Sequence, residues 1–207
     1  MTGVPEPGQP RRKATRERLY QAAVDLIAER GFSATTVDDI AVRAGVAKGT
    51  VYYNFPSKTA LFEALLRHGI GLLTDQIREA AAGKEPVPAI EAITAAQLAY
   101  IQKYRAFAQL LLSEMWRTNR EWRQTVTLLR EEVVEAIAEV LRAGVASGEF
   151  DPDLDVEIAA SALFGVVLVV AVDWLVFSPQ RPVEEVHQAL LGIVSSRLGT
   201  SGRPGLS

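Results

Sequence analysis

The chain has 207 residues with a net charge of −3, and 48% of its residues are hydrophobic and 23% charged. This balance is typical of a globular protein and excludes disorder of the whole chain. Cysteine is absent and the two histidines lie far apart in sequence, which excludes disulfides, a cysteine nucleophile and a multi-histidine metal site. We expect neither a metal ion nor a cofactor.

Both ends of the chain have the composition of disordered tails. Residues 1–10 contain three prolines and two glycines, and residues 199–207 are similar. The charges of the N-terminal segment are not followed by an apolar run, so this segment does not fit a signal peptide. We expect a cytoplasmic protein with disordered tails at 1–10 and 199–207.

The charge is unevenly distributed along the chain. Residues 11–58 contain nine basic and five acidic residues, a net charge of +4, whereas the rest has 13 basic and 20 acidic residues, a net charge of −7. A basic module on an acidic body is typical of a nucleic-acid-binding protein. A chance cluster of charges on a solvated surface is the alternative at this point.

Helical periodicity and capping signals define the first two helices. Apolar residues three and four positions apart predict an amphipathic helix over 12–30, and Gly31 follows it as a stop signal. Thr36, with Asp39 three residues later, predicts an N-cap with a capping box for a second, short helix. This second helix is expected to end at Gly45.

Two further helices follow. A third helix over 48–54 stops before Pro56, because the residue before a proline disfavours the helical conformation. Ser57 is the predicted N-cap of a long fourth helix. The second and third helices, with a glycine in the turn between them, form a helix-turn-helix arrangement over 37–55.

Small and branched residues fit the close packing of this arrangement. Ala41 allows the third helix to cross closely, Gly45 can adopt a positive φ in the turn, and Val51 packs the third helix onto the second. At 100° per residue, the inward stripe of the third helix is Ala47, Val51 and Phe55.

The opposite face of the third helix has side chains that suit DNA. The residues that point away from the inward stripe are Gly49, Thr50, Tyr52 and Tyr53. Gly49 permits a close approach, Thr50 can contact a thymine methyl or a phosphate, and tyrosine hydroxyls donate to phosphate oxygens. Packing of Tyr52 between the third and fourth helices is the alternative.

Basic side chains flank this face. Lys48 starts the third helix and can reach a guanine edge or a phosphate, and Lys58, at the start of the fourth helix, is placed to bind a phosphate. Before the first helix, a flexible arm near the duplex can consist of Arg11, Arg12 and Lys13. Helix-turn-helix geometry also occurs in proteins that bind no DNA, and a single basic residue is often only solvated.

This segment resembles a known family. The stretch from Thr35 to Leu61, TTVDDIAVRAGVAKGTVYYNFPSKTAL, is similar to the DNA-binding domain of the TetR family of bacterial transcriptional regulators. The similarity extends back through AAVDLIAERGF over 22–32, and the combination GV.KGT.Y..F.SK.AL carries it. The resemblance implies an all-helical homodimer whose N-terminal helices bind operator DNA, and whose C-terminal domain binds a small ligand and forms the dimer.

The resemblance also implies individual DNA contacts. By position, these are Thr36, Lys48, Gly49, Thr50, Tyr52, Tyr53, Asn54 and Lys58. Asn54 stands where many members of the family have histidine, a difference that can alter the base preference without abolishing binding.

Periodic segments between proline and glycine clusters continue to the C-terminus. Further helices are predicted near 89–104, 106–117, 120–147, 155–177 and 183–198. The predicted fold is therefore all-α with about nine helices: an N-terminal three-helix bundle with the helix-turn-helix and a larger C-terminal helical domain. We expect a DNA-binding domain over 11–56 and a ligand-binding and dimerisation domain over 57–198.

The helix expected over 155–177 is strongly apolar. Residues 158–172 contain no charge, but this run is shorter than the ~20 residues that a membrane span needs, and Asp173 interrupts it. A helix that is apolar on every face must be buried on all sides.

We expect the helix over 155–177 to pair, together with the helix over 183–198, with the same helices of a second subunit. The apolar stripe of that last helix is Val183, Val186, Leu190 and Ile193. Burial of both helices within one chain is the alternative.

A small-molecule site is expected among the central helices. Aromatic residues over 100–122 can give a cavity apolar walls and polar handles, and the resemblance places the inducer pocket in the same region. The candidate ligand-binding residues are His68, Tyr104, Phe107, Leu111 and Trp116. The alternatives are core packing for the aromatic residues and an ordinary satisfied or exposed side chain for His68.

These observations favour a ligand-responsive transcriptional regulator, expected to be a repressor, that binds an inverted-repeat operator as a dimer. A small-molecule inducer would release it by a population shift, with the fourth helix as the lever. An enzyme is the second hypothesis, but the sequence has no nucleophile elbow, glycine-rich phosphate loop or HExxH motif, so we expect no catalytic residue. An interaction protein that has lost DNA binding is the third hypothesis.

Overall fold

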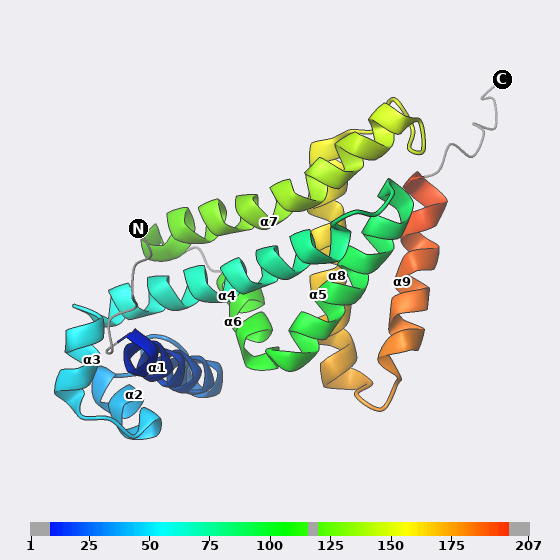
Figure 1. The fold of residues 1–207 in the computed structure, drawn as a ribbon. Helices are drawn as coiled ribbons and strands as arrows, with labels where there is room; N and C mark the ends of the chain where they lie inside the picture. The colour runs from blue at the N-terminus through cyan, green and yellow to red at the C-terminus, as the bar shows by residue number, and fades with distance from the viewer. Residues whose placement is uncertain (1–8, 116–119, 199–207) are drawn as a thin grey trace, which may run out of the picture. The chain divides into compact units, whose positions relative to one another are not determined.

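The computed structural model describes residues 9–115 and 120–198, which form nine α-helices and no strand (Figure 1). The predicted all-α fold with about nine helices is confirmed. The helices are α1 (Gln9–Arg30), α2 (Val37–Ala44), α3 (Lys48–Asn54), α4 (Lys58–Ala81), α5 (Pro86–Lys103), α6 (Arg105–Met115), α7 (Arg120–Ser147), α8 (Val156–Phe177) and α9 (Val183–Leu198). The predicted tails lie outside the described residues, except that residues 9 and 10 belong to α1.

The chain divides into two compact units, and the boundary lies inside α4, between His68 and Gly69. The N-terminal unit contains α1, α2, α3 and the first turns of α4, and the C-terminal unit contains the rest of α4 with α5–α9. The boundary expected from the sequence, between residues 56 and 57, lies just before the start of α4.

A small apolar core holds the N-terminal unit together. α1 packs against α2, and α2 packs against α3. Gly31 ends α1 with a φ of 83°, as the predicted stop signal requires. The buried apolar residues of this unit include Leu19, Ala23, Leu26, Ile27, Ile40, Val51, Phe55, Leu61, Phe62 and Leu65. This core fixes the orientation of α3 within the unit.

Most helix bounds agree with the predicted ranges, and the clearest difference is at the start of α5. The prolines Pro86 and Pro88 predict a break before residue 89, but α5 begins at Pro86. Proline is tolerated in the first turn of a helix because the N–H groups there have no intrahelical partner. The predicted end of the next helix, at residue 117, lies outside the described residues.

α5 is the central helix of the C-terminal unit. It packs against α6, α7, α8 and α9, and Figure 1 shows it beside α9. α7 and α8 also pack against each other. The buried face of α5 contains Pro86, Ala89, Ile90, Ile93, Thr94, Gln97, Leu98, Tyr100 and Ile101.

α8 is buried on one face and exposed on the other. Its buried residues include Leu163, Phe164, Val167 and Ala171, and its exposed apolar residues are Ile158, Val166, Val169, Val176 and Phe177. Within the described ranges, α8 is the one helix long and apolar enough to cross a membrane by length and composition, and 39% of its most apolar window is buried. The expected burial on all sides is not reached within a single chain.

α9 also divides into a buried and an exposed side. Of its predicted stripe, Val186 and Leu190 are buried in their own unit, whereas Ile193 is exposed. Nε2 of His187 lies 3.1 Å from the carbonyl oxygen of Glu91 on α5. Burial within one chain, the alternative considered above, therefore holds for Val186 and Leu190.

Candidate DNA-binding surface and ligand-binding unit

Gly45 shapes the turn between α2 and α3. It adopts the left-handed conformation, with φ 64° and ψ 42°, as the sequence predicts. Val51 and Phe55 are buried, which confirms two positions of the inward stripe. The third position is wrong: Ala47 is exposed. It is the N-cap of α3 and has an extended backbone, so its side chain does not follow the helical period.

The outward face of α3 is accessible. The side chain of Tyr53 is 75% exposed and that of Tyr52 is 48% exposed. A Cβ atom added at Gly49 would meet no heavy atom within 4 Å, whereas Thr50 is half-buried. Two phenol groups and an uncovered stretch of backbone therefore lie on a surface that a partner molecule can approach.

Lys48 begins α3 and is held by an ion pair. Its Nζ lies 2.7 Å from Oδ1 of Asp38 on α2, and both side chains are more than half exposed. The hydrogen bond to Asp38, and then the charge of that carboxylate, raise the pKa of Lys48. Asp38 therefore holds the ammonium group near the start of α3, and a nucleic-acid ligand would compete with Asp38 for it.

Two of the implied DNA contacts have side chains that are engaged within the unit. Nδ2 of Asn54 donates to the carbonyl oxygen of Thr50 at 2.8 Å. Nζ of Lys58 donates to the carbonyl oxygens of Phe32 and Thr35 at 3.0 and 2.9 Å, and lies 4.2 Å from the centre of the Phe32 ring. DNA contacts of Asn54 and Lys58 stay predictions. The sequence did not predict these hydrogen bonds, which connect the segment after α1 to the start of α4.

Thr36 is the N-cap of α2, and the predicted capping box is confirmed. Its Oγ1 accepts a hydrogen bond from the N–H of Asp39, and the carboxylate of Asp39 accepts one from the N–H of Thr36, both at 3.1 Å. Hydrogen bonds from Thr36, and then the charge of Arg30 at 3.1 Å, lower the pKa of Asp39. A DNA contact of Thr36 stays a prediction.

The predicted N-terminal arm is corrected by the structure. α1 begins at Gln9 and so includes residues 11–13, because Pro10 fits the first turn of a helix. The guanidinium carbon of Arg12 lies 5.6 Å from the centre of the Tyr53 ring. This contact joins α1 to the outward face of α3, and sequence reasoning missed it because the two residues are 41 positions apart. The side chain of Arg11 lies outside the described residues.

His68 contacts α1 within the N-terminal unit. Its Nε2 lies 3.1 Å from Oε2 of Glu17, and its ring stacks on Tyr20 with the ring centres 4.9 Å apart. These contacts satisfy the imidazole, which is the alternative that the sequence leaves open for this residue. A ligand contact of His68 stays a prediction.

The other candidate ligand-binding residues lie at the end of α5 and on α6. Phe107 and Leu111 are buried, and Tyr104 is half-buried. The rings of Tyr104 and Tyr100 lie 4.7 Å apart. Trp116 lies outside the described residues.

Tyr100 and Phe107 also bind α4 at Gly69. The hydroxyl of Tyr100 donates to the carbonyl oxygen of Gly69 at 2.7 Å, and a Cβ atom added at Gly69 would overlap the ring of Phe107. Burial raises the pKa of Tyr100, which keeps this hydroxyl protonated as a donor. The part of α4 that belongs to the C-terminal unit therefore packs against two aromatic residues of that same unit.

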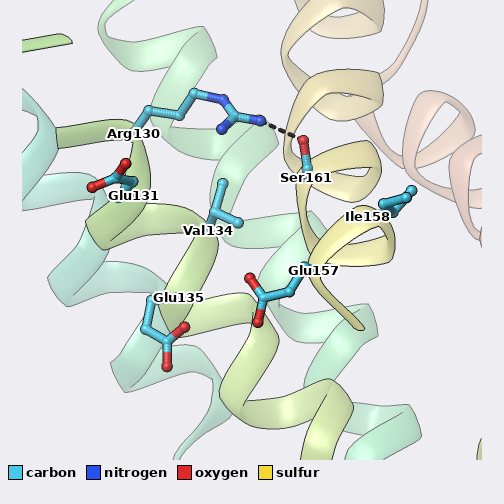
Figure 2. A pocket seen from close by; sticks show the side chains of 7 residues that line it. All are labelled: Arg130, Glu131, Val134, Glu135, Glu157, Ile158 and Ser161. Atoms are coloured by element: carbon cyan, nitrogen blue, oxygen red, sulfur yellow. Dashed lines mark hydrogen bonds between the residues drawn. The ribbon is translucent and has the colours of Figure 1, made fainter. Parts of the chain in front are cut away.

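A cavity of about 590 Å³ lies between α7 and α8 (Figure 2). The described residues that line it are Arg130, Glu131, Val134, Glu135, Glu157, Ile158 and Ser161. Arg130 donates to Oγ of Ser161, and the guanidinium of Arg142 pairs with Glu135 and Glu157. Three carboxylates and one guanidinium line this cavity, so it is acidic. It contains none of the candidate ligand-binding residues.

Each of the two units matches a known protein family model. Residues 19–65 match the family model of bacterial regulatory proteins of the tetR family, and residues 83–190 match the tetracyclin repressor-like C-terminal domain. The chain is 32% identical to the HTH-type transcriptional repressor KstR2 of Rhodococcus jostii, over 97% of this chain and 98% of that protein. It is 27% identical to the fatty acid metabolism regulator protein of Bacillus subtilis, over 86% and 93% of the two chains.

A solved structure shows the same fold. The crystal structure of FadR from Bacillus subtilis in complex with stearoyl-CoA matches 87% of this chain and 97% of that chain, with a TM-score of 0.79 and 24% identity.

Proposed function

Because the chain belongs to the TetR family of bacterial regulatory proteins, we propose that it is a transcriptional repressor that binds operator DNA as a homodimer and is released by a small-molecule ligand. Such a regulator acts by binding and needs no catalytic residue. It works where its DNA is, in the cytoplasm.

The observation that carries DNA binding is the exposed face of α3. Tyr52, Tyr53 and the backbone at Gly49 are accessible, and the ammonium group of Lys48 lies at the start of the same helix. Residues 11–58 around it have a net charge of +4. Phenol and ammonium groups bind phosphate oxygens, and a side chain at the start of a recognition helix reaches base edges.

The exposed strip of α8 supports a second subunit. Val166, Val169 and Val176 lie on one face by their spacing, and Ile193 of α9 is also exposed. An apolar strip of this length is covered by a partner or by lipid. Asp173 is exposed on the same face, and an unpaired carboxylate is costly in a membrane. We therefore assign 155–177 and 183–198 to an interface between two copies of the chain.

One relative and one solved structure support a fatty-acyl ligand. One is named for fatty acid metabolism, and a protein of the same fold was crystallised with stearoyl-CoA. The ligand is then a long-chain acyl-coenzyme A whose acyl chain lies in the C-terminal unit near Phe107 and Leu111, with Tyr104 closer to solvent. The acidic cavity between α7 and α8 does not suit the anionic coenzyme A group.

The conformational change that releases the protein from DNA would be transmitted through α4. This helix belongs to both units, because the boundary lies inside it at His68 and Gly69. A ligand that favours one conformation of the C-terminal unit then shifts the population of that conformation, and the continuous helix carries the change to the DNA-binding unit.

Selection of genomic fragments tests DNA binding. Purified protein is mixed with fragmented DNA of its source genome, and the bound fragments are sequenced. We expect an inverted repeat whose half-sites lie about one helical turn, ~34 Å, apart. The double variant Lys48→Ala with Tyr53→Ala should lose this enrichment. Absence of any enriched motif with the unaltered protein at low salt would refute the proposal.

A further inference from the structure

Gln97 is a polar residue in the centre of the C-terminal unit. Its side chain is 1% exposed, and its Nε2 has no hydrogen-bond partner among the residues that the structure describes. It shares the buried face of α5 with Ile90, Thr94 and Ile101, since these positions are three, four and seven residues apart. α5 as a whole packs against α6, α7, α8 and α9.

The other buried polar residues of this unit differ from Gln97. The hydroxyl of Thr94 donates to the carbonyl oxygen of Ile90 at 2.9 Å, and that of Thr74 donates to Ile70 at 3.0 Å. A buried N–H without an acceptor costs free energy in the folded state, and native proteins rarely leave one unmatched. The amide of Gln97 is therefore a donor whose acceptor is missing from the described part of the chain.

We propose that Gln97 binds the carbonyl oxygen of the acyl ligand through Nε2, and thereby selects thioesters over ligands that lack this oxygen. This assignment rests on the proposed function. Gln97 lies seven residues before Tyr104, so its amide is about 10 Å along α5 from the half-buried end of the helix. An acyl chain can then extend further among the apolar side chains, while the coenzyme A arm leads back towards Tyr104.

The lack of charge among the described buried residues also favours a thioester ligand. None of the described residues classed as buried is charged, so no buried cation is available to pair with a free carboxylate. Burial of an unpaired carboxylate is far more costly than burial of a neutral carbonyl that accepts one hydrogen bond. A neutral amide donor therefore favours a thioester over a free fatty acid.

Two matched ligands test the role of Gln97. Palmitoyl-coenzyme A has the carbonyl oxygen, and S-hexadecyl-coenzyme A is a thioether of the same chain length without it. We expect the unaltered protein to bind the thioester about tenfold more tightly than the thioether, as measured by calorimetry with the full-length chain. This comparison needs no variant.

Two variants then test whether Gln97 is the residue that causes this preference. Gln97→Met keeps the length of the side chain and removes the amide, so it should bind the two ligands with equal affinity. Gln102→Met is the matched control, because Gln102 is exposed on the same helix, and it should keep the tenfold preference. Thermal unfolding of each variant shows whether it is folded.

The possible outcomes separate the two proposals. If the unaltered protein binds both ligands equally, or if Gln97→Met keeps the preference, Gln97 does not bind the carbonyl group although the ligand class stands. If the unaltered protein binds neither ligand, the ligand class fails and the role of Gln97 fails with it. A lower melting temperature of Gln97→Met with an unchanged preference would indicate a structural amide, satisfied by a buried water.

Discussion

Asp38 forms an ion pair with Lys48 and, under the proposed function, would compete with DNA for its ammonium group. The two side chains form an exposed ion pair at 2.7 Å, and DNA bound to this ammonium group would have to displace the carboxylate. We expect Asp38→Asn to raise the affinity for operator DNA a few-fold, because it removes both the competitor and a negative charge close to phosphates. Lys48→Ala should lower the affinity and reduce the slope of log K against log salt by about one.

Fluorescence anisotropy at several salt concentrations measures both effects. Lys84→Ala is the control, because Lys84 is exposed in the C-terminal unit and should leave the salt slope unchanged. An unchanged salt slope for Lys48→Ala would mean that Lys48 contacts no phosphate.

The capping box of α2 makes stability depend on pH in the acid range. The pKa of Asp39 is lowered in the folded state, chiefly by the hydroxyl and N–H of Thr36. Its contribution is therefore fully present above the unfolded value of 3.8 and is lost as the pH falls through the lower folded pKa. We expect Asp39→Asn to melt at a lower temperature than the unaltered protein at pH 7, and the difference to shrink below pH 4. A difference that is independent of pH would contradict this account of the cap.

Single residues differ in how far the sequence predicts them. Thr36, Asp39 and Gly45 were predicted because caps and tight turns depend on neighbours within a few positions. The contacts of Lys58 and the burial of the Gln97 amide were not predicted, because both depend on packing between segments that are distant in sequence. Ala47 was misassigned because a periodicity argument holds only inside the helix, and Ala47 lies at its cap.

At the scale of elements, α4 contains two glycines whose surroundings differ. Gly69 lies in mid-helix under the ring of Phe107, whereas a Cβ atom at Gly71 would meet nothing within 4 Å. Alanine is the better helix former, by about 1 kcal/mol. Gly71→Ala should therefore stabilise the protein by up to about that amount. Gly69→Ala should destabilise it by about 1–3 kcal/mol, because the methyl group overlaps the ring.

Chemical denaturation of the two variants measures this contrast. A stabilising Gly69→Ala would show that Phe107 moves aside at little cost, and that α4 is not fixed at this point.

Helix positions were predicted well and helix environments less well. Periodicity and breakers located α7, α8 and α9 to within a residue or so. The start of α5 was placed too late, because proline was taken as a break at a position where it begins a helix. Which face of α8 packs inside its own chain could not be predicted, because a helix apolar on all sides gives no preferred direction.

At the scale of the whole molecule, the exposed strip of α8 is the proposed interface of the homodimer. Val169 is 49% exposed in the middle of this strip. We expect Val169→Glu to yield monomers, because a carboxylate would be buried next to its own copy or leave the interface open. Operator affinity should fall together with the loss of the dimer.

Analytical ultracentrifugation distinguishes the species. Leu128→Glu is the matched control, because Leu128 is similarly exposed on α7, outside the proposed interface, and this variant should remain a dimer. A dimeric Val169→Glu variant would move the interface away from α8.

The most direct test of a ligand-responsive repressor is a titration of the protein–operator complex with palmitoyl-coenzyme A, followed by fluorescence anisotropy of the labelled operator. Release of the DNA by palmitoyl-coenzyme A, with no release by coenzyme A alone, is the result that we expect, since the acyl chain must enter the apolar C-terminal unit. Operator affinity that stays the same at saturating palmitoyl-coenzyme A would contradict the account.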